Sequence, residues 1–200
     1  LDVPSLPPEV TLDIRNTANK RGRVQVTSPN GYVSQATVII RSDNQDYNNA
    51  PLEGDAYLTV TSGTLVNRGT VTISQTLANS YAQNAQAVLE AQVQNDPAGV
   101  ITMSTSSMTA GLCGQAILGK AGAARTNAGL IEVTGGAKNL INGSTLANLA
   151  SGVIRSSTGS STLGGTAALD NQGTLEVLGA GAPLIFTVNS FSGEGFAGIP

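Results

Sequence analysis

The sequence predicts an all-β protein and, within that class, a parallel β-helix, in which the strands of successive coils stack on one another. Three observations lead to this prediction. Short runs of aliphatic residues alternate with polar residues, Gly, Ser, Thr and Asn separate these runs, and one frame of residues recurs along the chain. A β-sandwich is the alternative, because its strands also alternate and end in Gly and Asn turns.

The composition limits the kind of core that this chain can build. Hydrophobic residues make up 40% of the 200 residues, but Trp is absent and there are only three Phe and four Tyr. The core must therefore consist of Val, Ile, Leu and Ala. A net charge of -3 and recurring aliphatic residues exclude a disordered chain. No apolar run reaches the roughly 18 residues of a membrane span. We expect one β-solenoid segment over residues 1–200, and the initial Leu1 indicates a processed chain or a fragment of a longer one.

The first element is a lead-in over residues 1–8, whose prolines favour an extended backbone. After it, a glycine followed by alternating polar and apolar residues recurs. From Gly69 onward these glycines lie 30, 30, 23 and 21 residues apart, which suits one solenoid coil of roughly 20–50 residues better than propeller blades or leucine-rich repeats. The copies are Gly22-Arg-Val-Gln-Val26, Gly69-Thr-Val-Thr-Ile73, Gly99-Val-Ile-Thr-Met103, Gly129-Leu-Ile-Glu-Val133, Gly152-Val-Ile-Arg-Ser156 and Gly173-Thr-Leu-Glu-Val177.

Alternation within this frame separates a buried face from an exposed one. The second and fourth residues after the glycine are apolar, apart from Ser156, so we expect both columns to face the core. The third residue is polar in every copy and should face solvent. This third column consists of Gln25, Thr72, Thr102, Glu132, Arg155 and Glu176.

Asparagine precedes most of these glycines, two residues upstream in three copies and four upstream in two. Asn and Gly adopt left-handed backbone conformations and close turns locally, so each copy should be a turn followed by a strand. The predicted turn residues are Asn67 with Gly69, Asn127 with Gly129 and Asn171 with Gly173, and turns with two extra residues follow Asn95 and Asn148.

Two features precede the asparagines. An apolar residue usually stands two positions upstream, and Arg125 is the exception in that column. In the stretch 78–94, Ala, Gln and Glu would permit a helix, but Leu89, Ala91 and Val93 alternate with polar residues. We therefore expect a strand in the second half of this stretch, after a short helical or loop excursion.

Stacking would bring equivalent residues of consecutive coils to within about 4.7–4.9 Å. Glu132, Arg155 and Glu176 would then form a ladder of alternating charge on the outer face, and Thr72 would lie above Thr102. An exposed ion pair contributes only about 0–1 kcal/mol, so this ladder should define register more than stability. A catalytic pair of the two glutamates is the less favoured interpretation, because Arg155 lies between them.

Much site chemistry is excluded by the residue types. The chain has no histidine and a single cysteine, Cys113, which excludes Ser-His-Asp and Cys-His catalysis and zinc sites that need several such ligands. The stretch GQAILGKA matches a phosphate-binding loop at Gly114, Gly119 and Lys120, but Ala121 replaces the hydroxyl that would bind magnesium. We therefore assign no catalytic residue, no cofactor and no metal ligand.

Two charged segments leave alternatives open. The acidic stretch 43–55 lacks the residue order of a calcium loop, so a solvated loop and weak calcium binding both remain. The basic run could bind a sulfated glycan or another polyanion, or it could form a solvated turn. Without interleaved aromatic residues it should not bind nucleic acid. The run consists of Arg15, Lys20, Arg21 and Arg23.

The units SGTLVNRGTVTI, TNAGLIEV and LDNQGTLEV resemble the filamentous-haemagglutinin-type repeats of bacterial two-partner-secretion exoproteins, and autotransporter passengers share this style. The resemblance covers roughly residues 20–180. It implies a right-handed parallel β-helix, export across a Gram-negative envelope and a secreted or cell-surface shaft for adhesion, biofilm contact or toxin delivery. It implies no catalytic residues.

We therefore expect a non-enzymatic structural and adhesive segment of a bacterial surface or secreted protein. Its partners would be glycans or surface proteins of a host or neighbouring cell, bound on flat faces rich in Thr, Ser and Asn. Two alternatives remain open. One is a β-helical carbohydrate-active enzyme that acts on acidic polysaccharide. The other is a biofilm module that self-associates through unpaired end strands.

Overall fold

The computed structural model describes residues 4–16, 21–44, 55–77, 86–105, 115–134, 139–158, 161–178 and 184–198. Strands and turns make up this part of the chain, and it contains no helix. It therefore also contains no helix that could cross a membrane. Every strand pair in it is parallel, which confirms the predicted all-β, parallel architecture.

Over the described residues the strands form two sheets. We call the 11-stranded sheet, whose edge strands include β1 and β17, sheet I. Its main path is β1 (Ser5–Leu6), β4 (Tyr32–Ser34), β6 (Ala56–Asn67), β8 (Gln86–Asn95), β10 (Gln115–Leu118), β13 (Asn139–Asn148), β15 (Ser161–Asn171) and β17 (Leu184–Thr187). Three further strands join it, namely β3 (Gly22–Val26) on β6, β11 (Arg125–Asn127) between β8 and β13, and β18 (Ser190–Ser192) on β15.

The second, 8-stranded sheet of the described residues is called sheet II. Its strands lie side by side in the order of the sequence. They are β2 (Thr11–Arg15), β5 (Thr37–Asn44), β7 (Thr70–Leu77), β9 (Val100–Thr105), β12 (Leu130–Thr134), β14 (Val153–Thr158), β16 (Thr174–Val177) and β19 (Phe196–Gly198).

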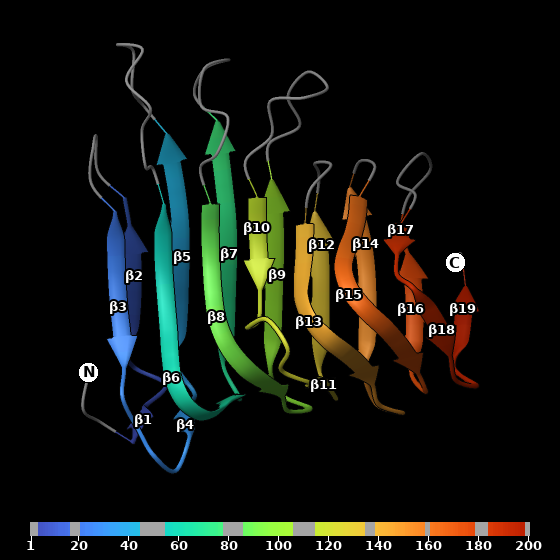
Figure 1. Cartoon of the computed structure of the whole chain (residues 1–200), viewed down its shortest axis with the longest axis horizontal. Helices are drawn as coiled ribbons and strands as arrows, with labels where there is room; N and C mark the ends of the chain where they lie inside the picture. Colours follow the sequence, from blue (N-terminus) through green and yellow to red (C-terminus); the bar gives the residue numbers. More distant parts are fainter. Residues whose placement is uncertain are drawn as a thin grey trace.

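Each coil passes once through each sheet. For example, β6 of sheet I leads into β7 of sheet II, and β8 then leads into β9. Figure 1 shows these coils stacked along the longest axis of the molecule, from the blue N-terminal coil to the red C-terminal coil. The arrangement is that of a parallel β-helix. The hand of its coil stays a prediction.

The core fills the space between the sheets, and the glycine frame predicted its sheet II side. Ile131 pairs in register with Ile101 of the preceding coil and Ile154 of the next, and all three side chains are buried. Burying an aliphatic side chain of this size contributes about 1.5–3 kcal/mol. Ser156, the polar exception in the inward columns, is buried as well, and its hydroxyl has no hydrogen-bond partner among the described residues.

The prediction that the copy at Gly22 is equivalent to the other copies, which lie in sheet II, is wrong. This copy lies on β3 in sheet I, where Gly22 pairs with Ala56. In the same coil, the strand of sheet II is β5. Its Thr37 pairs with Thr70, so Ala36 occupies the position that glycine holds in the later coils. Alternation cannot distinguish the two sheets, because strands of both have one inward and one outward face.

Other predicted elements fall where the alternation indicated. The strand expected in the second half of 78–94 is part of β8, and the excursion expected before it lies outside the described residues. The two longer turns are also confirmed, since Gly99 N donates to Asp96 O at 2.8 Å and Gly152 N donates to Leu149 O at 2.7 Å. Of the lead-in over 1–8, the structure describes residues from 4 onward, including β1.

Candidate functional site

The asparagines predicted as turn residues form a buried ladder along one corner of the coils. Each of them ends a strand of sheet I and is at most 2% exposed. The first donates its Nδ2 hydrogen to the Oδ1 atom of the second at 2.8 Å, and each later side chain donates to the next at 2.7 Å. The same amides also donate to backbone carbonyls of the first residues of sheet II strands, so buried polar groups are satisfied. The ladder consists of Asn67, Asn95, Asn127, Asn148 and Asn171.

The glycines that follow the asparagines leave room for this ladder. A Cβ atom on Gly129 would overlap the carbonyl oxygens of Gly99 and Asp96 and lie 2.9 Å from Nδ2 of Asn95. The left-handed backbone expected at Gly69, Gly129 and Gly173 is therefore not the reason for glycine there. The described glycines with positive φ are others, namely Gly31, Gly63, Gly119, Gly122, Gly165 and Gly193. Close approach of consecutive coils requires the frame glycines.

The outer face of sheet II carries polar side chains in columns. Thr72 pairs in register with Thr102, and Thr102 pairs with Glu132. A neighbouring column is formed by Ser74 and Ser104, and Thr134 continues it. These side chains are half-buried in the sheet surface. The stacked coils therefore present rows of hydroxyl groups with the spacing of hydrogen-bonded strands, about 4.7–4.9 Å.

The predicted charge ladder lies on this face. Glu132, Arg155 and Glu176 occupy one column in register. Arg155 Nε donates to Glu176 Oε2 at 2.7 Å, whereas no ion pair joins Arg155 to Glu132 in the described part of the chain. Both paired side chains are partly exposed, so the pair contributes about 0–1 kcal/mol.

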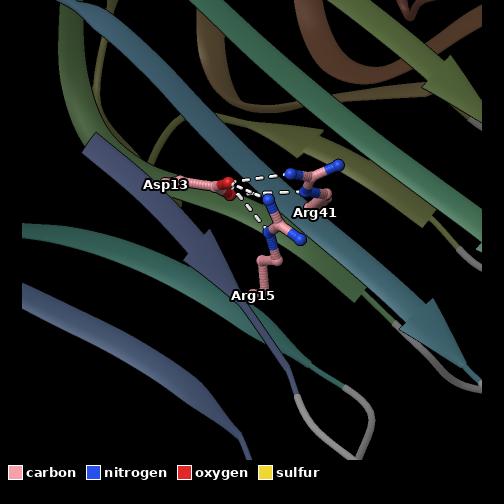
Figure 2. Close-up of polar contacts among 3 residues, drawn as sticks. All are labelled: Asp13, Arg15 and Arg41. Atoms are coloured by element: carbon pink, nitrogen blue, oxygen red, sulfur yellow. Dashed lines mark hydrogen bonds and ion pairs between the residues drawn. The ribbon is translucent and has the colours of Figure 1, made fainter. Parts of the chain in front are cut away.

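A second charged cluster lies at the first coil (Figure 2). Asp13 and Arg15 come from β2, and Arg41 comes from the neighbouring strand β5. Arg15 Nε donates to Asp13 Oδ2 at 2.8 Å, and Arg41 Nη2 donates to the same oxygen at 2.7 Å. Hydrogen bonds from Arg15, which have the larger effect, and from Arg41 hold the pKa of the Asp13 carboxyl well below its usual range. Two guanidinium groups thus share one carboxylate.

This cluster predicts an acid-dependent loss of stability. The pKa of Asp13 is lower in the folded than in the unfolded chain, so the stabilisation is present above the unfolded value of about 3.9 and disappears as the pH falls below it. The effect should be small, because the pair is on the surface. We expect Asp13→Asn to flatten the decline of the unfolding free energy between about pH 4 and pH 2. Urea titrations at several pH values measure this, and equal slopes for both proteins would contradict it.

Of the other predicted basic residues, Arg23 lies on the outer face of β3 in sheet I, and Arg21 directly precedes that strand. Arg21 Nε is 3.3 Å from Asp55 Oδ2. The guanidinium of Arg23 lies 5.4 Å from the centre of the Tyr57 ring, a cation-π distance. Lys20 lies outside the described residues. Of the described residues of the basic run, Arg15 therefore lies on sheet II and Arg23 on sheet I, because β2 and β3 belong to different sheets.

Arg125 is a buried cation in the core. It occupies the inward column that holds Leu146 in the next coil, and it is 2% exposed. Its Nη2 donates to Lys120 O at 2.7 Å, but its buried Nε and Nη1 have no hydrogen-bond partner among the described residues. Gly119, at φ +102, lies against the guanidinium, where a Cβ atom would overlap Nε. Burial lowers the pKa of Arg125 to about 10.

We expect Arg125→Leu to raise the free energy of unfolding by about 1–4 kcal/mol, because an apolar side chain replaces a buried charge that has no acidic partner among the described residues. Chemical denaturation measures the change. Arg155→Leu is the matched control on the surface and should shift stability by less than about 1 kcal/mol. A clear loss of stability in Arg125→Leu would instead mean that its bond to Lys120 O holds the adjoining turn together.

The remaining motifs do not form a site in the described part of the chain. The backbone amides of Gly119 and Lys120 donate to Leu89 O and Ala91 O of β8 and are not free for a phosphate, while Gly114 lies outside the description. The side chains of 43–54 also lie outside it, so calcium binding by the acidic stretch stays a prediction. Among the described residues, no three His, Cys, Asp or Glu side chains gather as they would around a metal ion.

Comparison of the chain with protein-family models, curated proteins and solved structures finds no match. The resemblance to exoprotein repeats therefore stays an expectation.

Proposed function

We propose that this chain is a non-enzymatic structural and adhesive β-helical segment of a secreted or cell-surface bacterial protein. The observation that carries the proposal is the aligned register of the outward polar column along sheet II, from Thr72 of β7 to Glu176 of β16. A stack of coils is a stiff shaft, because each coil is held by its neighbours through two sheets and the asparagine ladder.

The chemistry of the outer face favours glycans or protein surfaces as partners. Hydroxyl groups of Thr72, Thr102, Ser74 and Ser104 donate and accept hydrogen bonds, and they repeat along a flat surface. A glycan chain carries hydroxyl groups at regular intervals and can lie along such rows. Each hydrogen bond contributes about 0.5–1.5 kcal/mol, so binding depends on many of them acting together.

The enzyme alternative lacks a comparable observation. A polysaccharide-cleaving site needs carboxylates gathered in one place. The described carboxylates of Asp13, Asp55, Asp96 and Glu176 are each paired with arginine at different positions of the structure.

A binding measurement tests the proposal. The labelled 200-residue chain is applied to a glycan array and to bacterial and host cells, and the dissociation constant is measured for the strongest partner. A variant with Thr72→Ala, Thr102→Ala and Ser104→Ala should bind at least about tenfold more weakly, because three hydrogen-bonding groups are lost.

The control variant carries Gln92→Ala and Gln94→Ala on exposed positions of β8 in sheet I and should bind like the unaltered chain. Unfolding midpoints show that both variants are folded. The proposal fails if the chain binds no surface, or if both variants lose binding equally. Cleavage of an acidic polysaccharide by the chain would support the enzyme instead.

A further inference from the structure

One coil of sheet I is interrupted next to Arg125. In the coils on either side, β8 and β13 are continuous strands, whereas the coil between them has two short strands, β10 and β11 (Figure 1). Residues 119–124 connect these two strands, and Arg125 is the first residue of β11. Because Arg125 occupies an inward column, its guanidinium group lies in the core beside this interruption.

The guanidinium group is held along one edge. Its Nη2 donates to Lys120 O at 2.7 Å, and a Cβ atom on Gly119 would overlap both Nε and Nη2. The edge formed by Nε and Nη2 therefore packs against the backbone of the 119–124 connection. Nη1 does not belong to this edge. It is buried and has no hydrogen-bond partner among the described residues.

The charge of Arg125 has no acidic partner in the described core. Its pKa of about 10 lies well above neutral pH, so the side chain stays charged despite its burial. Among the strands of this coil and its two neighbours, the acidic residues are Glu90 of β8 and Glu132 of β12. Both stand in outward columns, where Glu90 Oε2 accepts from Thr59 Oγ1 at 3.1 Å and Glu132 pairs in register with Arg155. A buried charge is costly unless a partner of opposite sign compensates it.

The surroundings of Nη1 suit a small monovalent anion. Leu146 lies next to Arg125 in register, and Ala91 of the preceding coil accepts from Lys120 N at 2.9 Å. Ala91 and Gly119 contribute at most a methyl group to this part of the core. A halide ion accepts a hydrogen bond from any direction and requires no further donor. Sulfate and phosphate carry additional oxygen atoms, which would lose their hydration here without gaining donors.

The 119–124 connection also gives such an ion a short path from solvent. Lys120, Ala121, Gly122 and Ala124 are exposed, and no atom lies within 4 Å of a Cβ placed on Gly122. Lys120 adds a second positive charge at the surface, directly beside the carbonyl group that holds Arg125. Positive charges that line a path raise the local concentration of anions.

We propose that a chloride ion binds in the core beside Nη1 of Arg125 and compensates the charge of this side chain. The ion would join the interrupted coil to the coils that enclose it, because it binds only where these coils surround Arg125. The inference goes beyond adhesion, which uses the outer face of sheet II, and it does not depend on that function. An ion that binds the folded chain alone raises the ratio of folded to unfolded molecules.

Titration with chloride tests the proposal. Urea unfolding is measured at neutral pH in mixtures of sodium chloride and sodium methanesulfonate, a larger anion, at constant ionic strength, which keeps screening constant. The folded-to-unfolded ratio of the unaltered chain should rise up to about tenfold for each tenfold increase in chloride above the dissociation constant. Arg125→Leu should remove this response, so its advantage in stability should shrink as chloride is added. Arg155→Leu, the matched control on the surface, should retain the response.

Anomalous scattering from crystals of the unaltered chain grown in sodium bromide is a second measurement, and it does not require Arg125→Leu to fold. A bromide ion in contact with Nη1 is the expected result. Crystals with no bromide beside Nη1 would overturn the proposal, and water in that place would show that Nη1 is hydrated instead. An equal response to chloride in the unaltered chain and in Arg125→Leu would overturn it as well.

Discussion

Replacing Asn127 by alanine is expected to lower the free energy of unfolding by about 2–5 kcal/mol, the range for leaving several buried polar groups without partners. Asn127 stands in the middle of the ladder. Its Oδ1 accepts from Asn95, and its Nδ2 donates to Asn148 Oδ1 and to Val153 O. Alanine removes all of these bonds in a place that water does not reach.

Urea unfolding measures the change, and Asn171→Ala is the matched control. Asn171 is the last member of the described ladder and accepts from Asn148 without a further asparagine to donate to. Asn171→Ala should therefore lower the free energy of unfolding by about half as much as Asn127→Ala. Asn127→Asp should be as harmful as alanine, because a carboxylate cannot donate the hydrogen bond to Asn148. Equal and small effects below about 0.5 kcal/mol for all three variants would show that the ladder adds no net stability.

Gly129→Ala is expected to lower the free energy of unfolding by about 3 kcal/mol or more, because the added methyl group overlaps main-chain atoms that cannot rotate away. The Cβ atom would meet the carbonyl oxygens of Gly99 and Asp96 and the ladder amide of Asn95. The stacked coils would have to separate at this corner. Chemical denaturation measures the loss, and hydrogen exchange of the β9 and β12 amides should locate it.

Gly122→Ala separates crowding from other effects of the substitution. No atom lies within 4 Å of a Cβ placed on Gly122, although its φ is +74. Gly122→Ala should therefore lower the free energy of unfolding only by the backbone strain, about 1–2 kcal/mol. If Gly129→Ala were no worse than Gly122→Ala, close coil packing would not be the reason for the frame glycines.

The sequence predicted the sheet II half of the coils because one inward column repeats there with a glycine before it. The pairs Ile101 with Ile131 and Ile131 with Ile154 follow directly from that alignment. The assignment of Gly22 was wrong because an alternating strand fits either sheet, and only the three-dimensional structure shows that Ala36 takes the glycine position.

The burial of the asparagines was missed for a different reason. A turn asparagine and a stacked asparagine have the same place in the sequence, and turn propensity alone favours the first. The signal was their recurrence at one position of each coil, since stacked amides form ladders between identical side chains. The accommodation of Arg125 could not be predicted, because it depends on the backbone of Gly119 and Lys120 rather than on its own column.

The asparagine corner also determines where this chain can change in length. Partners along the ladder are 28, 32, 21 and 23 residues apart, yet their hydrogen bonds differ by no more than 0.1 Å. Much of the difference arises at the opposite margin, where 106–114 connect β9 to β10 but only 159–160 connect β14 to β15. Insertions at that margin should leave the cross-section unaltered, so peptides or whole domains can be added there in series, one per coil, along a shaft of constant width.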